Sequence, residues 1–289
     1  MDGPDRSSLP RRASQSARTV LPRSIDATPP VDPVFGEVLD AGLSLLSLEL
    51  DSGARAALEA HARLLLAWNA HVNLTGLRSA EQIARGHVLD ALVAVAPLRS
   101  MLDAHPSVLD LGSGAGYPGL PLALALPAGR AALVDSIGKK AAFLGIACAA
   151  ALDALGASGT AHRPELIVLA ERAEDLAQES DQREAWDLVT ARAVGSVAEV
   201  AEIGLPLARP GGHVAIWKIA DAGGQLAAEI AGAERIVQAA GGSTPRVVRL
   251  PEVDRLGLAG HCLVVIDKRR PTPDRYPRPP GERKRGRIP

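Results

Sequence analysis

The run of residues 108–120, Val-Leu-Asp-Leu-Gly-Ser-Gly-Ala-Gly-Tyr-Pro-Gly-Leu, constrains the fold of this chain more than any other stretch. Apolar residues surround one carboxylate, Asp110, and an apolar run from Leu120 to Leu126 follows. Between them glycine stands at every second position, at Gly112, Gly114 and Gly116. This order predicts a buried strand, a tight turn that approaches a ligand closely, and a helix N-terminus directed at that ligand. The alternative is an ordinary glycine-rich turn of any α/β protein.

Two classes of adenosine cofactor bind at such a turn. The dinucleotide fingerprint G-x-G-x-x-G needs its third glycine where this chain has Tyr117. Asp110 would add negative charge near the pyrophosphate of NAD, whereas a carboxylate is favourable near the sulfonium and ammonium groups of S-adenosylmethionine. The helix N-terminus remains available for the carboxylate of that cofactor. The motif therefore favours S-adenosylmethionine, with Asp110, Gly112, Gly114 and Gly116 as candidate binding residues.

A second carboxylate follows the next predicted strand. The apolar run 131–134 ends in Asp135, which stands 23 residues after Gly112 and is followed by Ser136. In a βαβ unit Asp135 would lie at the carboxyl end of the second strand, where it can accept hydrogen bonds from both ribose hydroxyls of an adenosine. NAD would need the same residue, and a strand-end Asp can also cap a turn. Asp135 and Ser136 therefore join the candidate site without deciding between the two cofactors.

From residue 107 onward the pattern alternates between strands and helices. The predicted strands are 108–111, 131–134, 166–170, 187–191, 213–217, 246–250 and 261–266. The predicted helices between them include 139–155, 172–178, 196–207 and 223–240. The connection before the last strand is short, which suits antiparallel pairing because a parallel pair needs a crossover. We therefore expect an α/β fold with a Rossmann-like seven-stranded sheet, parallel with an antiparallel terminal strand, and this favours a class I methyltransferase over a dehydrogenase.

The remaining segments suggest four regions. Residues 1–35 are rich in Pro, Ser and Arg and are predicted to be a disordered extension. Residues 36–100 carry apolar positions at helical spacing and are predicted to form a helical cap. Residues 101–267 form the predicted methyltransferase domain, and residues 268–289 form a basic, proline-rich tail.

Charge is segregated along the chain. The formal net charge is −1, yet residues 268–289 hold nine Lys or Arg residues against two acidic ones. A basic tail on an acidic body is typical of an arm that contacts nucleic acid, and the alternative is a solvated, disordered end.

Composition excludes several other classes. The two cysteines, Cys148 and Cys262, lie in apolar runs and resemble small buried hydrophobes of a reducing compartment. We therefore expect no disulfide framework and no metal site. No stretch reaches the length of a membrane span without a charge or a proline, and the first 35 residues lack the apolar core of a signal peptide. A cytoplasmic protein without a membrane partner is the expectation.

Several segments, taken in order, resemble one bacterial family. They are Trp68-Asn69-Ala70-His71-Val72-Asn73-Leu74-Thr75, His87-Val88-Leu89-Asp90, the glycine loop, Asp135-Ser136-Ile137-Gly138-Lys139-Lys140, Ala191-Arg192-Ala193 and Tyr276-Pro277-Arg278-Pro279-Pro280-Gly281. Their combination, from about residue 45 to the C-terminus, resembles the glucose-inhibited division protein B family. That family methylates N7 of one guanine, position 527, of 16S ribosomal RNA.

The resemblance implies a class I methyltransferase fold with S-adenosylmethionine at the carboxyl ends of the strands. It also implies a partner, which is 16S ribosomal RNA or the small ribosomal subunit. Carried over residue by residue, it implies cofactor contacts from Gly112, Tyr117, Asp135, Ala173, Glu174 and Arg192. The family often has Leu where Tyr117 stands, so only a backbone or packing contact transfers at that position.

Methylation of N7 places a particular demand on the residues. N7 of guanine is an in-plane lone pair without a proton, so no general base is needed to create the nucleophile. We expect no catalytic base, and rate from near-attack positioning and fixed dipoles. The candidates for positioning the base are Arg192, Lys218, His87 and Asp90. The competing interpretations are a strand-end ion pair for Arg192, a solvated Lys218, and a paired buried histidine for His87.

Three other functions stay open from the sequence. A methyltransferase of a small, proton-bearing molecule would depend on a base and would not need the basic tail. An NAD-linked oxidoreductase would turn over nicotinamide and would not bind S-adenosylhomocysteine. A non-enzymatic RNA-binding protein would keep the fold without transferring a methyl group.

Overall fold

The computed structural model describes residues 21–160 and 162–283 of the 289-residue chain. One sheet of seven strands runs through the described part, in the order β3-β2-β1-β4-β5-β7-β6. The strands are β1 (Ser107–Leu111), β2 (Arg130–Val134), β3 (Glu165–Leu169), β4 (Trp186–Arg192), β5 (Ala208–Ile219), β6 (Arg246–Arg249) and β7 (His261–Asp267). Each predicted strand is confirmed; β5 begins five residues before its predicted start, and every other end shifts by at most two residues.

The direction of the last strand is also confirmed. The first five strands pair in parallel, and β7 is antiparallel to both β5 and β6. Although β7 is the last strand of the chain, it lies between β5 and β6, so the four-residue β6 forms the edge of the sheet. The short link between β6 and β7 allows only the antiparallel hairpin that the sequence predicts.

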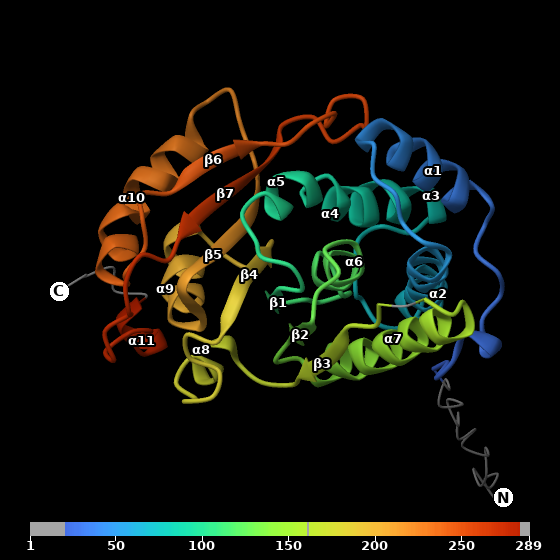
Figure 1. The fold of residues 1–289 in the computed structure, drawn as a ribbon, viewed down its shortest axis with the longest axis horizontal. Coiled ribbons are helices and arrows are strands. Elements are labelled where there is room, and N and C mark those ends of the chain that lie inside the picture. Colours follow the sequence, from blue (N-terminus) through green and yellow to red (C-terminus); the bar gives the residue numbers. More distant parts are fainter. Residues whose placement is uncertain (1–20, 161, 284–289) are drawn as a thin grey trace, which may run out of the picture.

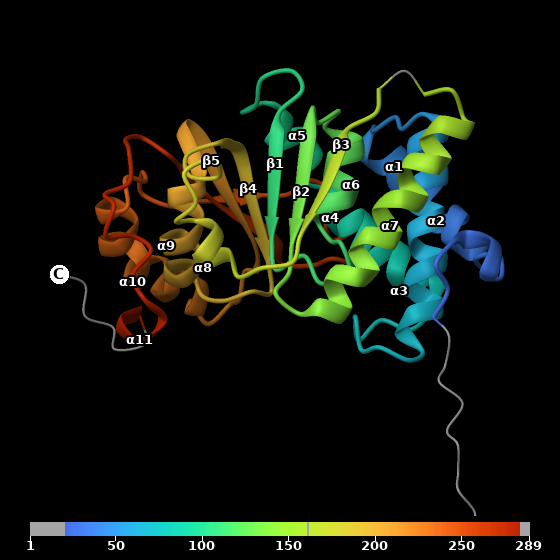
Figure 2. The ribbon, with the colours of Figure 1, turned by 90° about the horizontal axis from the view of Figure 1, so that it is seen from below.

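Helices cover both faces of the sheet (Figures 1 and 2). One face carries α8 (Ala173–Leu176), α9 (Val197–Leu207) and α10 (Gln225–Ala239). The other face carries α6 (Gly119–Ala125), α7 (Gly138–Ala157) and the N-terminal helices. Alternate residues of β1 point to opposite faces, because Val108 belongs to one hydrophobic core and Leu109 to the other.

The N-terminal region is helical, as predicted. Its helices are α1 (Val34–Leu46), α2 (Ser52–Asn69), α3 (Ala80–Ile83), α4 (Asp90–Leu92) and α5 (Val95–Arg99), with a π-helical turn over Ala84–Leu89. These helices share one continuous core with α6, α7 and a face of the sheet. The region is therefore part of the same packed body.

Part of the predicted disordered extension is ordered. Residues 21–35 pack against α2, where the Arg63 guanidinium donates to the carbonyls of Ile25 and Thr28 and the Trp68 indole donates to that of Pro22. The prediction is therefore wrong for residues 21–35, because backbone carbonyls of this polar stretch find donors on a helix. Residues 1–20 lie outside the described residues.

The basic tail is not a free arm over residues 268–283, a segment that we call the C-terminal strap. Lys268 is buried and pairs with Glu184 at 2.9 Å, and Arg278 is buried and pairs with Glu202 at 2.7 Å. The interpretation of this stretch as a disordered end is therefore wrong, because Lys268 and Arg278 pair with carboxylates of the acidic body, whereas Arg269, Arg270 and Arg275 stay exposed. Lys284, Arg285 and Arg287 lie outside the described residues.

One helix comes near the length and composition of a membrane span, although it carries Lys139, Lys140 and Asp153 and so leaves the expectation unchanged. By length and composition alone α7 is apolar enough to cross a membrane, with a mean hydropathy of 1.5. Its Phe143, Leu144 and Ala147 belong to the core beneath α2 and the sheet. The apolar composition of α7 thus has a packing reason in this fold.

Candidate functional site

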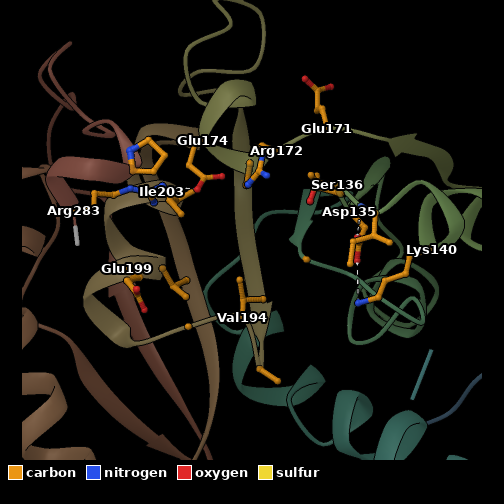
Figure 3. A pocket seen from close by; sticks show the side chains of 18 residues that line it. Asp135, Ser136, Lys140, Glu171, Arg172, Glu174, Val194, Glu199, Ile203 and Arg283 are labelled. Atoms are coloured by element: carbon orange, nitrogen blue, oxygen red, sulfur yellow. Dashed lines mark hydrogen bonds and ion pairs between the residues drawn. The ribbon is translucent and has the colours of Figure 1, made fainter. Parts of the chain in front are cut away.

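A cavity of about 490 Å³ opens where β1, β2 and β4 end, beside α8 and α11 (Pro280–Arg283). Parallel strands of an open α/β sheet place their ligand sites at this carboxyl edge. Of the predicted cofactor-binding residues, the cavity is lined by Gly112, Asp135, Ser136, Ala173 and Glu174. Figure 3 shows Asp135 and Ser136 on one side and Glu174 with Arg283 on the other. Segments far apart in the sequence therefore meet in one site.

The glycine loop needs the left-handed conformations that glycine permits. Gly112, Gly114 and Gly116 have φ angles of 62°, 57° and 89°. A Cβ on Gly112 would lie 2.8 Å from Cγ2 of Val194, which also lines the cavity. Ser113 ties the turn to both strands, since its amide donates to the Val134 carbonyl and its hydroxyl to the Asp110 carbonyl. The loop is therefore fixed before any ligand binds.

Asp135 lies at the end of β2 and faces the cavity, as the sequence predicts. One carboxylate oxygen accepts from the Gly114 amide at 3.0 Å and the other from the Ile137 amide at 2.9 Å. Lys140 approaches to 3.9 Å. A carboxylate has about four acceptor positions, so two amides leave capacity for hydroxyl groups. Asp135 therefore braces the glycine loop and still presents acceptors to the cavity.

Asp110 has a different position from the one expected of a ligand contact. Its side chain is fully buried, accepts from the Thr190 hydroxyl at 2.7 Å and the Gly119 amide at 3.2 Å, and does not line the cavity. Burial raises the pKa of Asp110 to about 6, although these hydrogen bonds oppose the rise. The expectation of a direct contact is corrected: Asp110 joins β1, β4 and the start of α6 beneath the loop.

The far wall of the cavity combines α8 with the C-terminal strap. Glu174 forms an ion pair with Arg283, and both line the cavity. Burial would raise the pKa of Glu174, but the hydrogen bond and charge of Arg283 outweigh it and keep the pKa below its usual range. Glu174 is therefore held as an anion at the position that the sequence predicted.

Arg192, His87 and Asp90 form a second group, between the end of β4 and the π-helical turn. The Arg192 guanidinium donates to Asp90 at 2.7 Å and to Nδ1 of His87 at 2.6 Å. Since arginine only donates, Nδ1 of His87 is unprotonated, and Nε2 donates to the Thr75 hydroxyl at 2.7 Å. His261 of β7 donates to the other oxygen of Asp90 at 2.6 Å. The three residues contact one another, as the competing interpretations of a strand-end ion pair and a paired buried histidine expect, and a role in positioning the base stays a prediction.

An aromatic stack lies beside this group. The Tyr117 ring is stacked between His61 and His87, with centroid distances of 4.5 Å and 4.6 Å. Burial lowers the pKa of His61 to about 4, and burial together with the Arg192 charge lowers that of His87 to about 3. Both rings are therefore neutral at neutral pH. Tyr117 and Gly116 pack against these helices and, like Gly114 and Arg192, do not line the cavity.

Lys218 lies near the end of β5 and contacts Gly195, a residue of the cavity lining. Its ammonium donates to Glu229 at 2.6 Å and to the Gly195 carbonyl at 3.1 Å. The ammonium charge of Lys218 is therefore paired with a carboxylate of α10, and contact with a substrate phosphate stays a prediction.

Sequence reasoning missed several lining residues, among them Ile137, Val194, Glu199 and Arg283. Ile137 and Val194 are exposed although apolar, at 52% and 45%. Both directly follow residues that the motifs did identify, Ser136 and the segment ending in Ala193. Their position next to these motif residues could have identified Ile137 and Val194 as lining residues. Nothing in the local sequence connects Arg283 to Glu174.

The fold and the site together define a class. A Rossmann-like sheet with an antiparallel β7, and a cavity at the carboxyl ends of β1, β2 and β4, characterise an α/β protein of the class I methyltransferase type. A family model described as rRNA small subunit methyltransferase G matches residues 54–255. The chain belongs to the rRNA small subunit methyltransferase G family.

Individual relatives agree with this assignment. Ribosomal RNA small subunit methyltransferase G of Roseiflexus sp. (strain RS-1) is 40% identical over 240 residues, which are 83% of this chain and 92% of that protein. The protein of the same name from Moorella thermoacetica is 36% identical over 242 residues, or 84% and 91% of the two chains. The solved S-adenosylmethionine-dependent methyltransferase SibL aligns with a TM-score of 0.42 and 18% identity, covering 83% of this chain and 70% of that one.

Proposed function

We propose that this chain transfers a methyl group from S-adenosylmethionine to N7 of guanine 527 in 16S ribosomal RNA. The observation that carries the proposal is the match of residues 54–255 to the family, together with a cavity at the carboxyl edge of the sheet. The substrate is the RNA or the small ribosomal subunit, and the site of action is the cytoplasm.

The residues of the cavity fit the methyl donor. An adenosine has ribose hydroxyls that need acceptors and a ring with two apolar faces. Asp135 and Glu174 supply carboxylates, and the exposed side chains of Ile137 and Val194 supply apolar surface. In this proposal Gly112, Asp135, Ser136, Ala173 and Glu174 hold the donor. When bound, S-adenosylmethionine supplies an electrophilic methyl group on a sulfonium.

The loop residues act beneath the site. Asp110, Gly114, Gly116 and Tyr117 hold the turn against β4 and the N-terminal helices, so the backbone at Gly112 is rigid. Rigid support of this kind keeps a bound donor close to one orientation. These four residues are proposed as positioning residues, which revises the direct contacts expected for Asp110, Gly114, Gly116 and Tyr117.

Arg192 is the proposed link between the donor and the base. Asp90 and His87 fix its guanidinium, and its side chain is 17% exposed. A fixed cation at a strand end suits an acceptor such as O6 of guanine or the carboxylate of the donor. His87 and Asp90 therefore position Arg192, and neither is proposed to touch the base.

No residue needs to remove a proton. The lone pair of N7 attacks directly, and the two buried histidines, with pKa values of about 3 and 4, stay neutral throughout the physiological range. The target base has to be unpaired or turned out of its stack to reach the cavity edge. Catalysis in this proposal rests on positioning and on desolvation of the reacting atoms.

Calorimetric titration tests the donor assignment. The full chain is titrated with S-adenosylhomocysteine and, in parallel, with NAD. Saturable binding of S-adenosylhomocysteine and no heat from NAD is the expected result. Binding of NAD alone would support the oxidoreductase alternative and remove the proposal.

A further inference from the structure

The C-terminal strap forms part of the cavity wall. Pro280 and Arg283 line the cavity together with residues from β1, β2 and β4. Arg283 stands 109 residues after Glu174 in the sequence, yet Figure 3 shows its side chain directed toward Glu174. The C-terminal strap therefore contributes residues to the wall of the candidate donor site.

The strap is anchored firmly enough to serve as a wall. The Arg278 guanidinium and amide contact both oxygens of Glu202 on α9, at 2.7 to 3.0 Å. The Arg183 guanidinium donates to the carbonyls of Thr272 and Tyr276 at 3.0 Å and 2.9 Å. The Tyr276 ring is fully buried. Residues 272–278 are thus fixed on both sides, and α11 follows directly at the cavity.

Arg283 has one donor in use and one without a partner. Its Nη2 pairs with Glu174, and its side chain is only 10% exposed. Its Nε–H is buried and has no hydrogen-bond partner among the described residues. A buried, unsatisfied donor costs free energy unless a ligand supplies the acceptor. Arg283 lines the cavity, and because protein atoms cover its Nε, the guanidinium has to turn for an acceptor of a bound molecule to reach that N–H.

We propose that Arg283 completes the methyl-donor site, fixing Glu174 and offering its Nε–H to an acceptor atom of the bound nucleoside. The inference rests on the proposed function, since the nucleoside is the adenosine part of S-adenosylmethionine. It assigns to Arg283 of the tail a role in donor binding, where the charge pattern alone suggested contact with RNA.

The test measures affinity for S-adenosylhomocysteine by calorimetry in the full-length chain. Arg283→Ala should weaken binding by about tenfold or more, because a charge-assisted contact is lost. Arg283→Lys keeps a positive charge opposite Glu174 but lacks the planar guanidinium with its several donors. Its affinity for S-adenosylhomocysteine should therefore lie between those of the wild type and Arg283→Ala. In a background of Glu174→Gln the effect of Arg283→Ala should shrink, which a merely structural role would not produce.

Arg275→Ala is the matched control, because Arg275 is an exposed cation of the same strap. It should leave the affinity for S-adenosylhomocysteine unchanged. Equal affinities of the wild type and Arg283→Ala would overturn the inference, as would a loss of RNA affinity in Arg283→Ala with donor affinity intact. Failure of the wild type to bind S-adenosylhomocysteine at all would instead refute the proposed function.

Discussion

At the scale of single residues, the buried carboxylate of Asp90 holds Arg192 at the end of β4. Asp90 is 2% exposed and accepts from Arg192 and His261 on separate oxygens. Asp90→Asn removes the charge and leaves the guanidinium without its counter-ion, so we expect the free energy of unfolding to fall by about 3 kcal/mol. Urea denaturation measures it.

Asp103→Asn serves as the comparison for this prediction. Asp103 also pairs with an arginine, Arg209, but its side chain is 88% exposed. The expected change is within about 0.5 kcal/mol. If both variants lose the same free energy of unfolding, burial of the Asp90–Arg192 pair adds nothing to stability.

His61 should give the stability of the fold a pH dependence. Its pKa is lowered from 6.5 to about 4 by burial, so the unfolded chain binds the extra proton between these values. The stabilisation is complete above pH 6.5 and is lost as the pH falls toward 4, at up to about 1.4 kcal/mol per pH unit. Asp110, whose pKa is raised to about 6, acts in the opposite direction below pH 6.

His61→Asn should therefore flatten the rise of stability between pH 4 and 6.5. Denaturant midpoints at several pH values measure the slope, which separates this effect from any uniform loss of packing. The exposed His71→Asn is the control and should leave the slope as it is. A slope unchanged by His61→Asn would contradict the assignment of a neutral buried ring.

The sequence predicted the residues of the site that belong to local motifs. Gly112 and Asp135, which the motifs identify, and Glu174, which the family resemblance identifies, all line the cavity because each follows closely on a strand end. Pairing between distant segments could not be predicted: Lys218 reaches Glu229, and Arg283 reaches Glu174, only through the tertiary fold. Asp110 was identified by its position in the motif, but its direction beneath the loop depends on Thr190 of the neighbouring strand.

At the scale of elements, the glycine loop depends on Gly112. Alanine there would have a φ of 62° and a Cβ 2.8 Å from Val194. Left-handed backbone costs about 1–2 kcal/mol for a residue with a side chain, and Val194 would have to move at the cavity. We expect Gly112→Ala to weaken binding of S-adenosylhomocysteine by about tenfold or more.

Gly145→Ala provides the matched substitution for this test. Gly145 lies within α7, and a Cβ added there would meet no atom of a neighbouring element within 4 Å. This change should stabilise the chain by up to about 1 kcal/mol and leave the affinity unaltered. If Gly112→Ala binds S-adenosylhomocysteine as tightly as the wild type, the glycine loop does not belong to the donor site.

The C-terminal strap depends on the buried pair of Glu202 and Arg278, which are 2% and 6% exposed. Glu202→Gln leaves the guanidinium buried with a neutral partner, so unfolding should become easier by about 3 kcal/mol. Thermal or urea unfolding measures the change. Glu252→Gln, which breaks the exposed pair with Arg255, should change stability by less than about 0.5 kcal/mol.

The elements themselves were largely predictable, and the strap was not. Apolar strands and glycine or proline breaks predict all seven strands, because periodicity and turn chemistry are local. The strap is rich in Pro and Arg, a composition that also fits a disordered tail. Its order comes from carboxylates on α9 and after α8, which composition alone does not locate.

At the scale of the whole molecule, the N-terminal helices and the sheet form one body with a cavity at the carboxyl edge. The helices pack on the sheet through a shared core, and residues from the cap fix Arg192 next to the donor cavity. This arrangement places the candidate donor cavity beside Arg192, a cation that Asp90 and His87 hold in place. It suits a reaction that needs positioning more than proton transfer.

One measurement tests this account most directly. The full chain is incubated with methyl-labelled S-adenosylmethionine and small ribosomal subunits, or their 16S RNA, from a strain that lacks the endogenous enzyme. The RNA is then digested and its labelled nucleoside identified. The account predicts label in 7-methylguanosine at a single site. Absence of label in the RNA, or label in a different nucleoside, would contradict it.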